Sequence, residues 1–232
     1  MPDHRTGVVF DFNGTLFFDS SLHVSAWDAT AAAIGAGHVD AHTMATVYSG
    51  LPNAEILKRM RPGMDDAFYS YWSQYKEAAY RDAVLHIPGG AKLAPGAVEL
   101  FEALSDHHIP FTIASASIVE NIRFFVRVFD LDQWMDPDTI VYDDGSYRDK
   151  TAMYETAFRR LGIDTAYIFE DAAAGLQAAS KVAGAKILLI DSAALRPYVN
   201  RYPACIGMIH DFYEGRKQLE EEGLLNESTE GI

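Results

Sequence analysis

Short apolar runs alternate with segments of helical periodicity from about residue 95 onward, and this alternation restricts the fold more than any other feature of the chain. Predicted strands occupy residues 7–11, 110–115, 166–170, 186–190 and 205–209. Predicted helices occupy residues 96–104, 118–129, 151–161 and 173–183, and a polar segment at 142–149 carries a turn signal. Strands joined by helices form a parallel sheet with crossover helices on both faces, so we expect an α/β fold with a doubly wound parallel sheet.

The region from about residue 20 to residue 85 follows a different pattern. It is rich in Ala, Met, Trp and Tyr, most of it has helical periodicity, and Pro52, Pro62 and the PGG sequence at 88–90 interrupt it. We therefore expect a helical domain at residues 18–89, inserted into a core domain made of residues 1–17 and 90–232.

Composition limits the partners that the chain can have. The 232 residues carry a formal net charge of −14, which argues against nucleic acid as a partner because phosphate backbones are bound by excess Lys and Arg. No apolar run approaches the ~18 residues that a membrane span needs, and the first residues do not resemble a secretion signal. The single Cys205 excludes an internal disulfide. We expect a cytoplasmic protein with no nucleic-acid or membrane partner, either a monomer or a weak homodimer.

Polar residues gather where the predicted strands end, which is where parallel α/β sheets bind their ligands. At or near these ends lie Asp11, Asn13, Gly14, Thr15, Ser115, Lys150, Glu170 and Asp171. Carboxylates suit a hard divalent cation such as Mg²⁺. A lysine, a hydroxyl and the free backbone amides expected in a glycine turn suit a phosphoryl group. A carboxylate can also attack phosphorus and form an aspartyl-phosphate.

Five of these residues also have a purely structural interpretation. Asp11 can cap a turn, and Ser115 can begin the helix predicted after it. Lys150 can lie on a solvated helix face, and Glu170 with Asp171 can stabilise the start of the helix that follows them. Separate structural roles do not explain why all of them fall at correctly ordered strand ends, so we favour one shared site.

Four segments in this order resemble the motifs of the haloacid dehalogenase (HAD) superfamily. Residues 11–16 (DFNGTL) resemble its first motif, DxDGTL, and residues 113–117 (IASAS) its second. Lys150 resembles its third motif, and residues 169–175 (FEDAAAG) its fourth, EDxxxG. Resemblance to the β-phosphoglucomutase-like and phosphoglycolate phosphatase-like branch extends to Asp19, His23, Ala26, Trp27, Lys76, Tyr80, Pro95 and Gly96.

The resemblance implies a Rossmann-like HAD core with an α-helical cap inserted after the first strand, and a Mg²⁺-dependent phosphohydrolase. It implies that Asp11 is the nucleophile and that Ser115 and Lys150 hold the phosphoryl oxygens. The implied metal ligands are Asp11, Asp171 and the backbone carbonyl of Asn13, with Glu170 bound directly or lying just outside them. The implied substrate contacts are Gly14, Thr15, Ser115, Ala116, Lys150, His23, Lys76 and, in a loop of the cap, Gly50.

Asn13 departs from the family pattern, because phosphatases and mutases of this superfamily carry an aspartate there. That aspartate protonates the leaving oxygen and later takes a proton from water. An amide cannot transfer a proton at neutral pH, and the loss of a positioned acid–base group typically costs about 10²–10⁴-fold in rate. The sequence therefore predicts a site that binds metal and phosphate but turns over slowly unless something compensates.

Four hypotheses are compatible with Asn13. Another group, such as Asp19 or His23, can take the proton role, or the leaving group can be a good one, as in an acyl phosphate. Asn13 can deamidate to aspartate, because Asn-Gly is the sequence in which deamidation is easiest. The chain can be a phospho-ligand binding protein without catalysis, or it can perform non-phosphate chemistry. We rank hydrolysis of a small phosphorylated metabolite first, with a sugar phosphate as the expected substrate, and a phosphomutase second.

Overall fold

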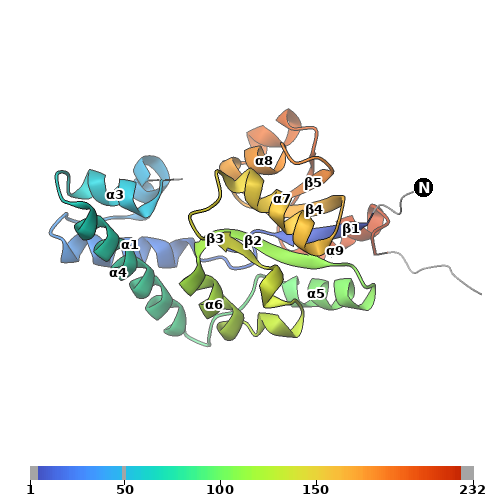
Figure 1. The fold of residues 1–232 in the computed structure, drawn as a ribbon, viewed down its shortest axis with the longest axis horizontal. Coiled ribbons are helices and arrows are strands. Elements are labelled where there is room, and N and C mark those ends of the chain that lie inside the picture. The colour runs from blue at the N-terminus through green and yellow to red at the C-terminus, as the bar shows by residue number, and fades with distance from the viewer. Residues whose placement is uncertain (1–4, 49–50, 226–232) are drawn as a thin grey trace, which may run out of the picture. The chain divides into compact units, whose positions relative to one another are not determined.

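The computed structural model describes residues 5–48 and 51–225. It divides into two compact units, one made of the described residues up to Phe18 and from Lys92 onward, and the other of Asp19–Ala91 (Figure 1). The first unit contains a six-stranded sheet in the order β3-β2-β1-β4-β5-β6, and every neighbouring pair is parallel. The strands are β1 (Thr6–Phe10), β2 (Phe111–Ile118), β3 (Val141–Asp143), β4 (Thr165–Glu170), β5 (Ala185–Ile190) and β6 (Cys205–Ile209).

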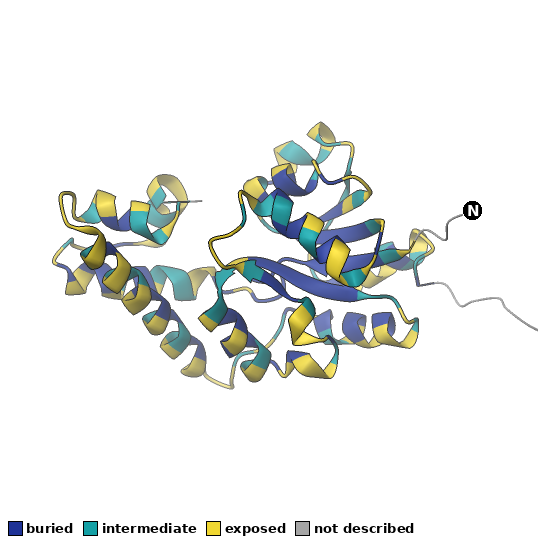
Figure 2. Cartoon of the chain, in the orientation of Figure 1, coloured by how far each residue is buried: buried dark blue, intermediate teal, exposed yellow. Residues whose placement is uncertain are grey.

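Helices cover both faces of this sheet. Successive residues of a strand point to opposite faces, and in β1 Val9 belongs to an apolar cluster with residues of α7 (Lys150–Leu161) and α8 (Ala173–Ala179). Phe10, on the opposite face, contacts the rings of Phe101 in α5 (Ala97–Asp106) and Phe212 in α9 (Phe212–Glu221). β1 is therefore buried on both sides, as Figure 2 shows for most of the sheet, and this explains why its sequence is apolar without alternation.

The remaining helices of the first unit are short or flank the sheet. Phe12, just after β1, stacks on Phe125 of α6 (Val119–Val128) with ring centroids 4.2 Å apart. Within the described part of this unit there are also three 3₁₀ helices, at Leu131–Gln133, Pro137–Thr139 and Arg196–Arg201.

The second unit is helical. Its core is formed where α1 (Ser20–Ala33) and α3 (Asn53–Met60) pack on α4 (Asp66–Leu85), around Trp27 and Leu57. Asp65 begins α4 by accepting a hydrogen bond from the backbone N–H of Phe68, at 2.8 Å. A short helix α2 (Ala41–Thr43) and a π-helical turn (Met44–Tyr48) lie between α1 and α3.

The predicted doubly wound parallel sheet is confirmed, and all five predicted strands are present. β3 and α9 are among the elements that the sequence pattern did not indicate. β3 spans three residues at the start of the segment predicted to be polar, and α9 follows the last strand. β3 is too short to show a periodic pattern. None of the described helices is both long enough and apolar enough to cross a membrane.

Candidate active site

The carboxyl ends of β2, β1 and β4 lie next to one another in the sheet. β1 is the first strand of the chain, and β2 and β4 pair with it on either side, so the strand order reverses at β1. Ligands of doubly wound sheets bind at such a reversal. Asp11 directly follows β1, and its N–H donates to the carbonyl of Phe169 in β4 at 3.0 Å. Ser115 lies in β2 and Glu170 ends β4, so the fold places these three side chains at one edge.

Lys150 joins Asp11 to Glu170. It is the first residue of α7, whose start is fixed by Asp149 accepting from the N–H of Ala152 at 3.0 Å. The Lys150 Nζ lies 2.9 Å from Asp11 Oδ1 and also donates to Glu170 Oε1. One ammonium group therefore pairs with two buried carboxylates.

Burial and charge act against each other at this pair. Burial raises the pKa of Asp11 to about 8, although the positive charge of Lys150 opposes the rise. The carboxylates of Glu170 and Asp171 raise the Asp11 pKa further. Burial alone would lower the pKa of Lys150, but the charges of Asp11 and Glu170 outweigh it and raise that pKa above its ordinary value. Lys150 therefore stays positively charged. Unless a second cation lies beside it, Asp11 keeps its proton up to about neutral pH.

Glu170 is fully buried and accepts four hydrogen bonds. Lys150 and the hydroxyl of Tyr154 donate to its Oε1. The backbone N–H groups of Asp171 and Ala172 donate to its Oε2, at 3.0 and 3.2 Å. Both carboxylate oxygens are therefore engaged by protein donors, which orients Glu170 and ties Lys150 to the end of β4.

Two glycines make room for these carboxylates. A Cβ added at Gly175 would overlap the carboxylate of Glu170, and one added at Gly14 would overlap that of Asp171. Gly14 also has a φ of +77°, which disfavours any other residue there. The glycines of the first and fourth sequence motifs are thus explained by space for acidic side chains.

Three acidic residues form a possible metal site. Asp11, Glu170 and Asp171 each offer a carboxylate oxygen, and these oxygens all lie within 4.8 Å of one another. Three carboxylates against the single charge of Lys150 leave an excess of negative charge, which fits a hard divalent cation with oxygen ligands. The charge and the oxygen chemistry at this edge therefore fit the Mg²⁺ ion that the sequence predicts.

The turn after β1 differs from the prediction. The N–H of Gly14 donates to the carbonyl of Phe17 at 2.8 Å, and that of Thr15 donates to the carbonyl of Phe12 at 3.3 Å. The expectation of free backbone amides at Gly14 and Thr15 is therefore wrong, because the tight turn consumes both donors. The Oγ1 of Thr15, however, is buried and finds no hydrogen-bond partner among residues 5–48 and 51–225.

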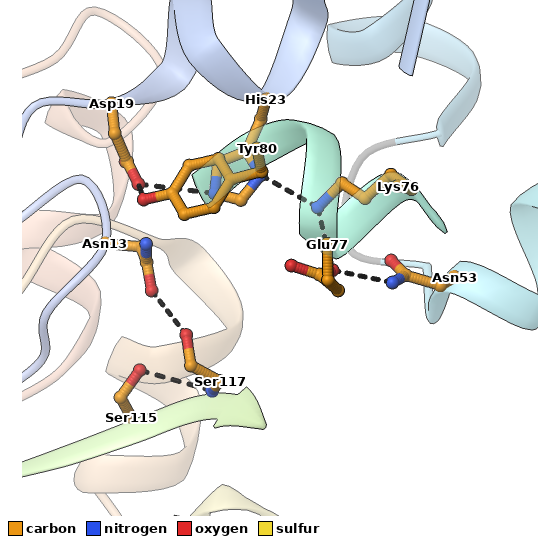
Figure 3. A network of polar contacts seen from close by, with 9 residues as sticks. All are labelled: Asn13, Asp19, His23, Asn53, Lys76, Glu77, Tyr80, Ser115 and Ser117. Atoms are coloured by element: carbon orange, nitrogen blue, oxygen red, sulfur yellow. Dashed lines mark hydrogen bonds and ion pairs between the residues drawn. The ribbon is translucent and has the colours of Figure 1, made fainter. Parts of the chain in front are cut away.

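Two serines of β2 reach the same region. The N–H of Ser117 donates to Ser115 Oγ at 3.2 Å, and the Ser117 hydroxyl donates to Asn13 Oδ1 at 2.6 Å (Figure 3). Ala116 lies between them and is exposed. The structure thus joins Asn13 to β2 through Ser117, a residue to which the sequence motif assigns no specific role.

The helical unit holds a polar network of its own. Lys76 is 3% exposed, and its Nζ lies 3.0 Å from His23 Nδ1 and 2.9 Å from Glu77 Oε1. Asp19 accepts from the hydroxyl of Tyr80, and its Oδ2 lies 3.3 Å from His23 Nε2 (Figure 3). The tyrosine ring stacks on that of His23 with centroids 4.2 Å apart.

This network brings His23 and Lys76 together within one unit, with Lys76 buried rather than on a solvated face. The predicted substrate contact Gly50 lies outside the described residues.

Sequence reasoning missed Tyr154 and the role of Ser117. Tyr154 follows Lys150 by four residues in α7, so both lie on one side of the helix. That spacing is the signal by which Tyr154 could have been found. Ser117 follows Ser115 by two residues in a strand and therefore faces the same side of the sheet.

Comparisons with known proteins agree with this fold. The model of the haloacid dehalogenase-like hydrolase family matches residues 6–183. A HAD hydrolase, family IA, variant 3, from Entamoeba histolytica is 30% identical, with a TM-score of 0.82 over 90% of this chain and 94% of that one. A mutant of CbbY from Rhodobacter sphaeroides in complex with xylulose-(1,5)bisphosphate is 21% identical, with a TM-score of 0.75 over 91% and 96% of the two chains.

A putative β-phosphoglucomutase from Bacteroides vulgatus is 19% identical, with a TM-score of 0.72 over 97% of this chain and 91% of that one. Below 25% identity, such likeness concerns the fold alone. A search of curated proteins found no match.

Proposed function

The chain belongs to the haloacid dehalogenase-like hydrolase family, and within that family we propose that it is a Mg²⁺-dependent phosphohydrolase acting on a small phosphorylated metabolite. The observation that carries the proposal is the arrangement of Asp11, Lys150 and Asp171 at one sheet edge. A carboxylate beside a lysine and a candidate cation site is suited to attack an anionic phosphoryl group, because both positive charges offset repulsion.

Asp11 is the proposed nucleophile. Its carboxylate forms a bond to phosphorus while the bond from phosphorus to the leaving oxygen breaks, which gives an aspartyl-phosphate. Water then attacks phosphorus and restores the carboxylate. Lys150 pairs with Glu170 throughout and with Asp11 while that carboxylate is free, so it stays charged, and it stabilises the phosphoryl oxygens together with Ser115.

The residues that would hold Mg²⁺ are Asp11, Asp171 and the backbone carbonyl of Asn13. When bound, the ion neutralises the carboxylates and the phosphoryl oxygens and so favours the ionised form of Asp11. Glu170 would act through Lys150 instead of binding directly, because both its oxygens already accept from protein donors. We also propose that the helical unit is the cap expected from the sequence. Substrate contact by His23 and Lys76 stays a prediction.

A phosphomutase is the second candidate. It is worth testing because a putative β-phosphoglucomutase from Bacteroides vulgatus shares this fold. In that case a sugar hydroxyl, and not water, would attack the aspartyl-phosphate.

The test is a phosphate-release screen with Mg²⁺ over sugar phosphates and other small phosphorylated metabolites. We expect release by the wild type and none by Asp11→Asn. Asp191→Asn is a matched control, because Asp191 also directly follows a strand, β5, but pairs with Arg196 at the surface. Release that continues in Asp11→Asn would refute the assigned nucleophile. Conversion of one sugar phosphate into another without release would favour the mutase.

A further inference from the structure

The side chain of Asn13 is held in one orientation. Its Oδ1 accepts the Ser117 hydroxyl at 2.6 Å (Figure 3). Because the oxygen end of the amide is turned to Ser117, the nitrogen end lies on the other side of the amide carbon and can only donate hydrogen bonds. Ser117 is itself fixed by its N–H, which donates to Ser115 Oγ.

The alternation of side chains along β2 brings Ser115 and Ser117 to the same face. Residues two apart in a strand face the same side, so the sequence Ser115-Ala116-Ser117 directs two hydroxyls one way. The pairing of β2 with β3 becomes irregular between Ser115 and Ile118, at the place where Ser117 lies. Asn13 follows Asp11 by two residues, so the oriented amide belongs to the same turn as the proposed nucleophile.

The turn that contains Asn13 also disfavours its deamidation. Deamidation requires the backbone nitrogen of Gly14 to attack the side-chain carbon of Asn13 and expel ammonia. That nitrogen instead donates to the carbonyl of Phe17 at 2.8 Å within a tight turn. We therefore expect the group at this position to remain an amide in the folded protein.

We propose that Ser117 positions Asn13 as a neutral hydrogen-bond donor, and that the site therefore selects acyl phosphates, whose leaving group departs without a proton. This inference rests on the proposed function and narrows its substrate class. An amide can stabilise a leaving oxygen but cannot protonate it. An alcohol leaving group needs that proton, whereas a carboxylic acid, with a pKa of about 4, leaves as a stable anion at neutral pH.

The atoms balance without an acid. The Asp11 oxygen bonds to phosphorus, the bond from phosphorus to the acyl oxygen breaks, and its electron pair stays on the departing carboxylate. The aspartyl-phosphate is itself an acyl phosphate, so one such bond replaces another. Water then attacks phosphorus, the carboxylate of Asp11 leaves, and the surplus proton passes to a phosphate oxygen or to solvent. With no base at Asn13, this second step is slow and the aspartyl-phosphate accumulates.

The test compares acetyl phosphate with ethyl phosphate in the presence of Mg²⁺, with Asp11→Asn as the blank for uncatalysed hydrolysis. We expect acetyl phosphate to be strongly preferred in kcat/KM and to leave a trapped phosphoprotein. Asn13→Asp should lower that preference by about 10²–10⁴-fold, which is the typical contribution of a positioned acid–base group.

Ser117→Ala tests the positioning. We expect kcat on acetyl phosphate to fall about tenfold with little change in KM, because one hydrogen bond to the amide is lost, and Ser117→Thr to restore it. Ser180→Ala is the matched control, since the Ser180 hydroxyl donates to a backbone carbonyl within its own helical turn.

The outcomes separate the two proposals. Equal or faster turnover of ethyl phosphate would overturn the acyl-phosphate inference and leave the phosphohydrolase standing. Identical kinetics in Ser117→Ala and Ser180→Ala would overturn the role of Ser117. No phosphate release from any phosphorylated compound would overturn the proposed function itself.

Discussion

Replacing Glu170 by glutamine changes one buried oxygen into an NH₂ group and keeps the shape of the side chain. In the native protein Oε1 accepts from Lys150 and Tyr154, and Oε2 accepts from the N–H groups of Asp171 and Ala172. With its NH₂ end in the place of Oε2, the glutamine meets two backbone N–H groups and loses both hydrogen bonds. With its NH₂ end in the place of Oε1, it loses the hydrogen bond from Lys150, although the Tyr154 hydroxyl can turn and accept. In either orientation the substitution removes the charge that pairs with Lys150 and breaks at least one buried hydrogen bond.

The cost follows from burial. A hydrogen bond to a charged group contributes roughly 1.5–3 kcal/mol, and breaking a buried ion pair costs about 3–5 kcal/mol. Lys150 keeps its contact with Asp11, so we take the lower end and expect Glu170→Gln to reduce the free energy of unfolding by about 3 kcal/mol. With a urea m-value of about 2 kcal/mol per M, the unfolding midpoint falls by roughly 1.5 M.

Urea unfolding in metal-free buffer, followed by circular dichroism, measures this change. Glu222→Gln is a matched control, because Glu222 also accepts from a lysine and a tyrosine, Lys186 and Tyr167, but at the surface and through one oxygen. A glutamine there can turn its carbonyl to both donors, so we expect a loss below about 1 kcal/mol. Equal losses in the two variants would refute the reasoning that four buried donors fix Glu170.

Three further predictions concern the same edge of the sheet. The pKa of Asp11 is raised from 3.8 to about 8 in the metal-free protein, so its contribution to stability is fully present below pH 3.8 and is lost as pH rises through about 8. Asp11→Asn should remove this part of the pH dependence of the free energy of unfolding. If the wild type and the variant lose stability in parallel as pH rises, the prediction is wrong. Gly175→Ala should lower the free energy of unfolding by more than about 2 kcal/mol, because the added Cβ overlaps the Glu170 carboxylate. Gly207→Ala is the control and should lower it by less than about 1 kcal/mol, because its Cβ meets only side-chain atoms at 3.4 Å or more. Mass spectrometry should find Asn13 unchanged after incubation of the folded protein at alkaline pH and deamidated in the urea-unfolded chain, and equal rates would show that the turn gives no protection.

The architecture and the position of the candidate site could be predicted from the order of residues alone. Strands alternating with helices predicted a parallel sheet, and a parallel sheet brings the carboxyl ends of its strands to one edge. Asp11, Ser115 and Glu170 could therefore be assigned to one place from their positions after apolar runs. The three-residue β3 was not predicted, because an element of that length carries no periodic signal.

What these residues do to one another became visible once the chain was folded. Ser117 and Asn13 are 104 positions apart in the chain, and no local pattern indicates that one orients the other. The hydrogen bonds that Glu170 accepts come from groups on separate elements, such as Tyr154 in α7. The raised pKa of Asp11 likewise arises from its burial among these elements. Local propensities fix which segments become strands and helices, whereas hydrogen-bond partners and dielectric surroundings exist only after those segments have packed together.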